Sequence, residues 1–190
     1  APARSPILQD EDLDWKTEES PVTLEKIMGA QSTLLPISFL AVGLERGRSV
    51  ARVKRADGST GSGFLIRGNI LVTNNHVLEN EDVARSAIAQ FNYEKTWTGL
   101  DMEPANYVLD PGVGFATSKE DDWTLVRVRE NANDQWGALE VAEASVHKLD
   151  LVNIIQHPGG GPKQIALYHN VVAYADEKRI QYITDTLPGS

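Results

Sequence analysis

The 190-residue sequence predicts an all-β fold built from short strands, in the form of a barrel or a sandwich. Short runs of apolar and β-branched residues recur along the chain, and turn-forming Gly, Asp and Asn residues separate them. Hydrophobic residues make up 41% of the chain and charged residues 24%, which is typical of a globular protein with a buried core. A chain of this length can form one domain or two small packed barrels.

The expected elements follow the chain in order. Residues 1–22 are acidic and polar, and we expect a tail or linker there, with a pro-segment as the functional alternative. Residues 23–28 have the spacing of one helical turn, and residues 79–89 are expected to form the longest helix. The expected strands lie at residues 36–44, 49–54, 62–66, 70–73, 124–128, 149–155, 164–174 and 179–183, with turns at 57–58 and 110–112.

Charge and residue usage argue against several classes of function. The net charge of −9 and the lack of a basic stripe disfavour a nucleic-acid partner. The absence of cysteine excludes disulfides and thiolate metal sites, and it favours a bacterial cytoplasmic protein over a secreted one. His157 and His169 lack further ligands at zinc spacing, so we expect no metal and no other cofactor. No apolar run is long enough to cross a bilayer, and we expect no membrane partner.

Two segments carry residues suited to nucleophilic catalysis. The apolar strand expected at residues 70–73 is followed closely by His76, at a point where a chain leaves the core. A histidine can take a proton from a hydroxyl group and later return it to a leaving amine. Asp122 stands just before a second expected strand, and its carboxylate could accept the imidazole N–H and fix the tautomer. Asp121 is adjacent, and by position alone either carboxylate could be the partner.

These segments resemble the trypsin-like serine peptidases of the chymotrypsin fold, nearest to the cysteine-free bacterial group that includes the glutamyl endopeptidases. The His motif of that family is matched by Val72-Thr-Asn-Asn-His76-Val77, and its Asp motif by Asp122-Trp-Thr-Leu125, which selects Asp122 over Asp121. Residues 61–66 resemble the strand before the His strand, and residues 154–160 resemble the start of the second barrel. The resemblance covers roughly residues 36–190.

The resemblance implies a chymotrypsin-like double six-stranded β-barrel. The first barrel would span residues 23–135 and carry His76 and Asp122, and the second would span residues 136–190 and be incomplete at its C-terminus. The implied activity is that of a serine endopeptidase, which hydrolyses peptide bonds through a Ser-His-Asp triad and an acyl-enzyme intermediate. Its substrate would be a protein or a peptide.

The family pattern Gly-x-Ser-Gly places the nucleophile near the end of this sequence. The oxyanion hole of the family uses the backbone N–H groups of the nucleophile and of the residue two positions before it. If Ser190 attacked, the second donor would be Pro188, which has no N–H. If the following residue attacked, the second donor would be Gly189. We therefore expect Gly189 in the oxyanion hole and the nucleophile directly after Ser190, with Ser190 itself as the alternative.

By the same register, Asp185 would lie near the floor of the specificity pocket, where trypsin-like enzymes select Arg or Lys. Glutamyl endopeptidases often carry an Asp-Thr pair there as well, so cleavage after basic residues and cleavage after Glu both stay open. Two other functions are compatible with the sequence. One is an inactive binding module with a protease fold, and the other is a protease effector regulated by a partner or a fused sensor domain.

Overall fold

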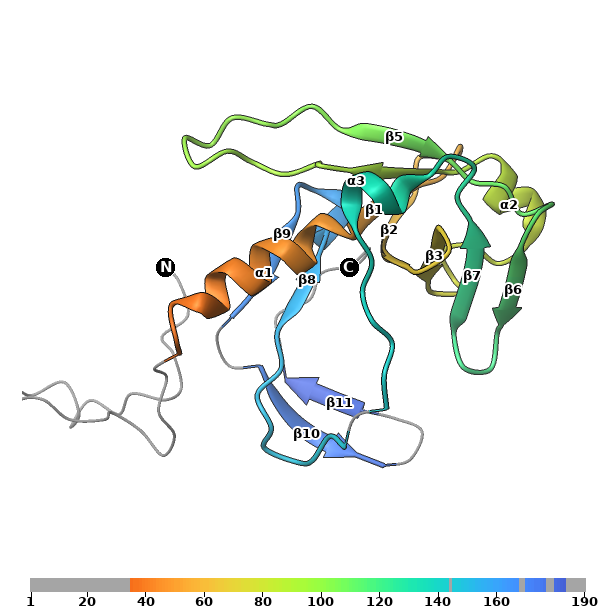
Figure 1. Cartoon of the computed structure of the whole chain (residues 1–190). Coiled ribbons are helices and arrows are strands. Elements are labelled where there is room, and N and C mark those ends of the chain that lie inside the picture. The colour runs from red at the N-terminus through yellow and green to blue at the C-terminus, as the bar shows by residue number, and fades with distance from the viewer. Residues whose placement is uncertain (1–34, 144, 168–169, 177–179, 184–190) are drawn as a thin grey trace, which may run out of the picture. The chain divides into compact units, whose positions relative to one another are not determined.

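An antiparallel sheet of seven strands dominates the part of the chain that the structure describes, which is residues 35–143, 145–167, 170–176 and 180–183 of a computed structural model (Figure 1). The chain divides into two compact units, Ala1–Leu40 and Ala41–Ser190, and the sheet belongs to the second. Its strand order is β5-β4-β1-β2-β3-β7-β6. The strands are β1 (Val50–Lys54), β2 (Thr60–Ile66), β3 (Ile70–Thr73), β4 (Ile88–Phe91), β5 (Ala105–Val108), β6 (Phe115–Ser118) and β7 (Trp123–Arg127).

Six of these strands curl around a common core, although the ladder is not continuous all the way round. The chain just after β5 meets the chain just after β7 at an isolated bridge between Leu109 and Val128. Two backbone hydrogen bonds flank this bridge: Asp110 N–H donates to the Arg127 carbonyl at 2.7 Å, and Arg129 N–H donates to the Val108 carbonyl at 3.0 Å. The sixth strand in sequence, β6, pairs with the other side of β7 and stands outside this ring.

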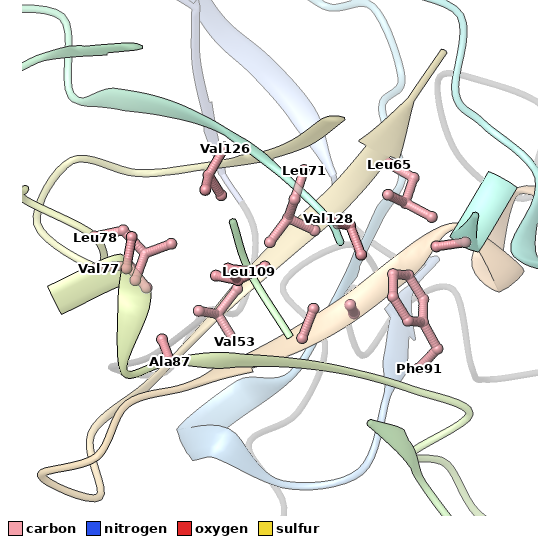
Figure 2. Packing of buried hydrophobic residues seen from close by; sticks show 14 of the residues in the cluster. Val53, Leu65, Leu71, Val77, Leu78, Ala87, Phe91, Leu109, Val126 and Val128 are labelled. Atoms are coloured by element: carbon pink, nitrogen blue, oxygen red, sulfur yellow. The ribbon is translucent and has the colours of Figure 1, made fainter. Parts of the chain in front are cut away.

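The core forms because alternate residues of the strands point inward. In β2 the burial alternates along the whole strand, which places Leu65 inside, and Leu71 and Val126 are inward on β3 and β7 (Figure 2). All three side chains are fully buried. Phe91 closes one part of the core, because its ring stacks on Trp136 with centroids 5.5 Å apart. Burying such side chains is the main source of stability in a fold of this kind.

The remaining described strands form two short hairpins. The first pairs β8 (Ile154–Gln156) with β9 (Gln164–Ala166), and a 3-10 turn, η3 (Pro158–Gly160), lies between them. The second pairs β10 (Val171–Ala175) with β11 (Ile180–Ile183). The three α-helices of the described residues are short: α1 (Ser38–Arg48), α2 (Glu81–Arg85) and α3 (Ala132–Trp136).

Two expectations from the sequence were wrong. Residues 36–44 were expected as a strand, but they enter helix α1, whose residues include strong helix formers such as Leu, Ala, Glu and Arg. The helix expected over residues 79–89 stops at Arg85, and Ile88 instead begins β4. Pairing with β1 (Arg52 with Gln90) overrides the local helical pattern there.

Other differences concern length and omission. The expected strand at 164–174 is two strands, β9 and β10. Of the strand expected at 149–155, residues 154 and 155 lie in β8, and Leu151 forms an isolated bridge with Val171. Strands β5 and β6 and helix α3 were not expected. The helical turn expected at residues 23–28 lies outside the described residues, and the division into a tail and two barrels stays a prediction.

Gly61 provides a test of core packing beside His76. A Cβ atom at this position would lie 2.5 Å from one methyl carbon of Val77 and 2.8 Å from the other. We expect Gly61→Ala to lower the free energy of unfolding by about 1–3 kcal/mol, as overpacking does. Urea denaturation measures this change.

A double-mutant cycle with Val77→Ala identifies the cause. Val77→Ala removes the crowding methyl groups, so adding Gly61→Ala to it should cost much less. Gly43→Ala in helix α1 is the matched control, because its Cβ would meet nothing closer than 3.9 Å. An equal loss from Gly61→Ala in both backgrounds would contradict the packing account.

Candidate active site

His76 lies in a tight turn directly after β3. The strand ends at Thr73, and the carbonyl of Asn74 then accepts hydrogen bonds from the backbone N–H groups of Val77 and Leu78, both at 3.2 Å. Val77 and Leu78 are buried in the core, so they anchor the turn. The His76 side chain, just before these anchors, stays 65% exposed. The sequence thus places a solvent-facing imidazole on a fixed piece of backbone.

Asp122 occupies the turn between β6 and β7. Its φ is +52°, in the left-handed region, which aspartate enters more readily than most residues. The next residue, Trp123, begins β7. Because β7 pairs with β3, and Thr73 lies opposite Thr124, the turn with Asp122 comes beside the turn with His76.

The two side chains form a close hydrogen-bonded pair. The His76 Nδ1 atom lies 2.8 Å from Oδ2 of Asp122 and 3.0 Å from Oδ1. The backbone N–H of His76 also donates to Oδ1, at 3.0 Å. A carboxylate can only accept hydrogen bonds, so this contact places the proton of a neutral imidazole on Nδ1 and leaves Nε2 as an acceptor.

The surroundings keep the Asp122 carboxyl ionised. Partial burial would raise its pKa, but hydrogen bonds from the backbone and side chain of His76, its charge, and a hydrogen bond from Asn74 bring the pKa below the ordinary value. The pair is largely open to solvent, where ion pairs contribute little to folding. Its main effect is therefore on the orientation and tautomer of the imidazole.

The neighbouring Asp121 faces a different partner. Its carboxylate accepts a hydrogen bond from the Ser118 hydroxyl at 3.0 Å, and its backbone N–H donates to the same oxygen atom. Of the two adjacent carboxylates, the structure brings Asp122 to His76.

The pair borders an open cleft of about 790 Å³. His76, Asp122 and Trp123 line one part of it. Its remaining walls come mainly from outward-facing residues of β2 and β3 and from β8, and they include Ser62, Phe64, Val72, Asn153, Ile154 and Ile155. The cleft has the size of a ligand site, and a peptide chain could reach the imidazole through it.

His157 belongs to a separate, buried cluster. It is fully buried in the hairpin between β8 and β9, its backbone N–H donates to Ser62 Oγ at 2.9 Å, and its Nδ1 lies 2.9 Å from the Gly161 carbonyl. The contact with the carbonyl assigns the proton to Nδ1. The Nε2 atom is buried and has no hydrogen-bond partner among the described residues.

Aromatic and basic groups surround this histidine. The Tyr93 ring stacks on it with centroids 6.1 Å apart, and the Arg52 guanidinium lies 3.7 Å above the same Tyr93 ring. Arg52 also donates to the Gly160 carbonyl at 2.6 Å. Lys163 is buried beside Glu94, at 3.8 Å, and burial lowers the pKa of its ammonium group. Burial, with Lys163 and Arg52 nearby, lowers the pKa of His157 to about 4.

Several residues singled out in the sequence lie outside the described part of the chain. They are His169, Asp185, Gly189 and Ser190. Among the residues that the structure does describe, no group of acidic or histidine side chains has the arrangement of a metal site. In the same part of the chain, no helix is long and apolar enough to cross a bilayer. Sequence reasoning missed the contact of Asn74, whose amide donates to Asp122 at the point where β3 ends and the neighbouring β7 begins.

Comparisons with known proteins bear on this geometry. A family model described as a trypsin-like peptidase domain matches residues 61–190. The uncharacterized protein y4fB of Sinorhizobium fredii is 34% identical over an aligned region of 190 positions, gaps included. The region covers 87% of this chain and 28% of that protein. The chain thus spans a little over a quarter of the length of this relative.

Solved structures share the fold at low sequence identity. Deg5 superposes with a TM-score of 0.58 at 14% identity, covering 82% of this chain and 78% of that one. A Glu endopeptidase gives 0.57 at 16% identity, with 84% and 74% covered. The active form of the Rv3671c protease of M. tuberculosis gives 0.55 at 17%, with 81% and 68% covered. These likenesses confirm the chymotrypsin-like β-barrel fold expected from the sequence.

The buried His157 predicts a specific loss of stability in acid. Its pKa is about 4 in the folded protein against 6.5 for an ordinary histidine, so the unfolded chain binds the proton more readily between these values. The folded protein therefore loses stability as the pH falls below 6.5, and this loss reaches about 3 kcal/mol at pH 4.

Urea denaturation at pH 7.5 and at pH 4 measures this loss. His157→Asn removes the titrating group, so the variant should lose about 3 kcal/mol less than the wild type between the two pH values. Since the same carboxyl groups titrate in both proteins, the difference isolates His157. Equal losses in the two proteins would contradict the assignment.

Proposed function

Because the chain belongs to the trypsin-like peptidase family, we propose that it carries the general base and the orienting acid of a serine endopeptidase. The observation that carries the proposal is the contact between His76 and Asp122 at the edge of an open cleft. Members of this family are peptidases, so the substrate is a protein or a peptide. The relative y4fB is much longer than this chain. An endopeptidase activity of the whole protein is therefore also a proposal.

His76 is the proton carrier in the proposed mechanism. Its Nδ1–H donates to Asp122, which leaves Nε2 free to take the proton of an attacking serine hydroxyl. The hydroxyl oxygen then bonds to the scissile carbonyl carbon, and the imidazolium that forms is stabilised by the Asp122 carboxylate. The imidazolium next gives its proton to the leaving amine, and the acyl-enzyme is hydrolysed by water activated in the same way.

The nucleophile is proposed to be a serine directly after Ser190 in the full-length protein. This register gives Gly189 as the second N–H donor of the oxyanion hole, whereas Ser190 as the nucleophile would require a donor from Pro188. Asp185 is proposed to lie near the specificity pocket. Cleavage after basic residues and cleavage after Glu are both compatible with an aspartate at that position.

A second candidate is a protease effector whose activity depends on a fused domain or a partner. The observation in its favour is length, because this chain corresponds to only 28% of its relative y4fB. Under this candidate, residues 1–22 are the linker, and residues 23–135 and 136–190 are the two barrels of the peptidase part.

Covalent labelling tests the nucleophile. We expect a fluorophosphonate to modify the full-length protein on the serine directly after Ser190, and we expect His76→Ala to abolish the label because the hydroxyl is then not activated. Intact mass and peptide mapping locate the label. A label on Ser190 would overturn the register, and a protein without label in the presence or absence of added partners would overturn the peptidase proposal.

The two adjacent aspartates provide a matched pair of variants. Asp122→Asn should reduce kcat by about 10⁴-fold, because the imidazole then takes the wrong tautomer, as in serine proteases generally. Asp121→Asn should change kcat by less than about threefold, since its carboxylate contacts Ser118. Peptide hydrolysis by the full-length variants measures both. Equal losses for the two variants would contradict the assignment of Asp122.

A further inference from the structure

Asn74, two residues before His76, contacts the acid of the pair. Its side-chain Nδ2 donates to the backbone carbonyl of Asp122 at 3.1 Å and lies 3.2 Å from Oδ2 of the same residue. These contacts link residues 48 positions apart. The family comparison assigns no role to this position, and the proposed triad does not use it.

We infer that Asn74 is a positioning residue, which holds the Asp122 carboxylate in the orientation that His76 requires. This inference rests on the proposed function for its catalytic consequence. The contact itself is a property of the folded chain and can be measured without any activity.

The position of Asn74 is suited to this role because its backbone forms the turn that carries His76 and its side chain contacts Asp122. Its backbone carbonyl accepts the N–H groups of Val77 and Leu78 and so forms the turn that carries His76. Its side chain meanwhile holds Asp122. Movement of one partner relative to the other would break one of these two sets of contacts.

Asp122 needs such a restraint. Its side chain is 45% exposed, and its backbone has a φ of +52°, a conformation that costs energy for a residue with a side chain. His76 contacts both carboxylate oxygens. The exposed imidazole can itself move, however, so this contact alone does not fix the carboxylate relative to the backbone. Asn74 adds a donor to Oδ2 and a second one to the main chain, so both parts of Asp122 are held.

The next residue, Asn75, makes contacts of a different kind. Its Nδ2 donates to Thr117 Oγ1 at 2.7 Å, and that hydroxyl lies 2.7 Å from Thr124 Oγ1. Thr124 in turn donates to the Leu78 carbonyl at 2.8 Å. This chain of hydrogen bonds joins the His76 turn to β6 and β7 beneath the site, and its side-chain bonds do not reach the Asp122 carboxylate. Asn75 is therefore a matched structural control for Asn74.

The first test is an NMR titration of the full-length protein. Asn74→Ala should raise the pKa of the Asp122 carboxyl, followed by its ¹³C shift, because one hydrogen bond that lowers this pKa is lost. It should also weaken the low-field signal of the His76 Nδ1 proton. Asn75→Ala should lower the urea midpoint of unfolding and leave both signals in place.

Asn74→Asp is the second variant, and it keeps the size of the side chain. It exchanges the donor for a like charge beside Asp122, so the pKa of Asp122 should rise further than in Asn74→Ala. If Asn74→Ala does not fold, the rise in the pKa of Asp122 can still be measured in Asn74→Asp against the wild type. Unchanged Asp122 and His76 signals in the folded Asn74 variants, or equal changes in Asn75→Ala, would overturn the inference.

Kinetics of the full-length protein give an independent readout. Loss of Asn74 should reduce kcat on the order of 10²-fold with little change in KM, because the misplaced pair affects the chemical step more than substrate binding. A wild-type protein without activity would count against the proposed function, and the NMR result would still decide the role of Asn74. A rise in KM with kcat unchanged would overturn the positioning role, because it would show that Asn74 acts on substrate binding.

Discussion

The pairing of β3 with β7 is the constraint on which the candidate site depends. These strands are separated by about fifty residues, yet their register places Ile70 opposite Arg127 and Thr73 opposite Thr124. The chain leaves β3 and enters β7 at the same end of the sheet, so the His76 turn and the Asp122 turn meet. A slip of one residue would move every side chain of a strand to the other face and separate the two groups. The buried residues of both strands, Leu71 and Val126, hold that register.

Polar groups beneath the site add directional contacts to this packing. The hydroxyls of Thr117 and Thr124 and the amide of Asn75 form one chain of hydrogen bonds that ends on the Leu78 carbonyl. Buried groups of this kind are stabilising only when each has a partner. His157 is the exception among the described residues, because its Nε2 lies buried without a hydrogen-bond partner. Its backbone N–H meanwhile binds Ser62 and so connects the β8–β9 hairpin to the seven-stranded sheet. Stability at this junction therefore depends on a neutral imidazole.

The sequence allowed prediction of the segments whose structure is set locally. The strand at residues 70–73 was predicted with its observed bounds, and the strand after Asp122 within one residue, since both are short apolar runs bounded by turn residues. The strand β4 could not be predicted in this way, because residues 88–91 take their form from pairing with β1. The contact of Asn74 with Asp122 could not be predicted locally either, since it joins the ends of two paired strands that are distant in the sequence. Only the family resemblance separated Asp122 from Asp121 in the sequence.

The measurement that tests the account most directly is a crystal structure of the full-length protein after reaction with a phosphonate inhibitor. The account predicts phosphorus on the serine directly after Ser190, with His76 Nε2 within about 3.2 Å of that serine oxygen and His76 Nδ1 still on the Asp122 carboxylate. It also predicts that the Gly189 N–H faces the phosphonyl oxygen. An adduct on another residue, or an adduct with His76 paired to a group other than Asp122, would contradict it.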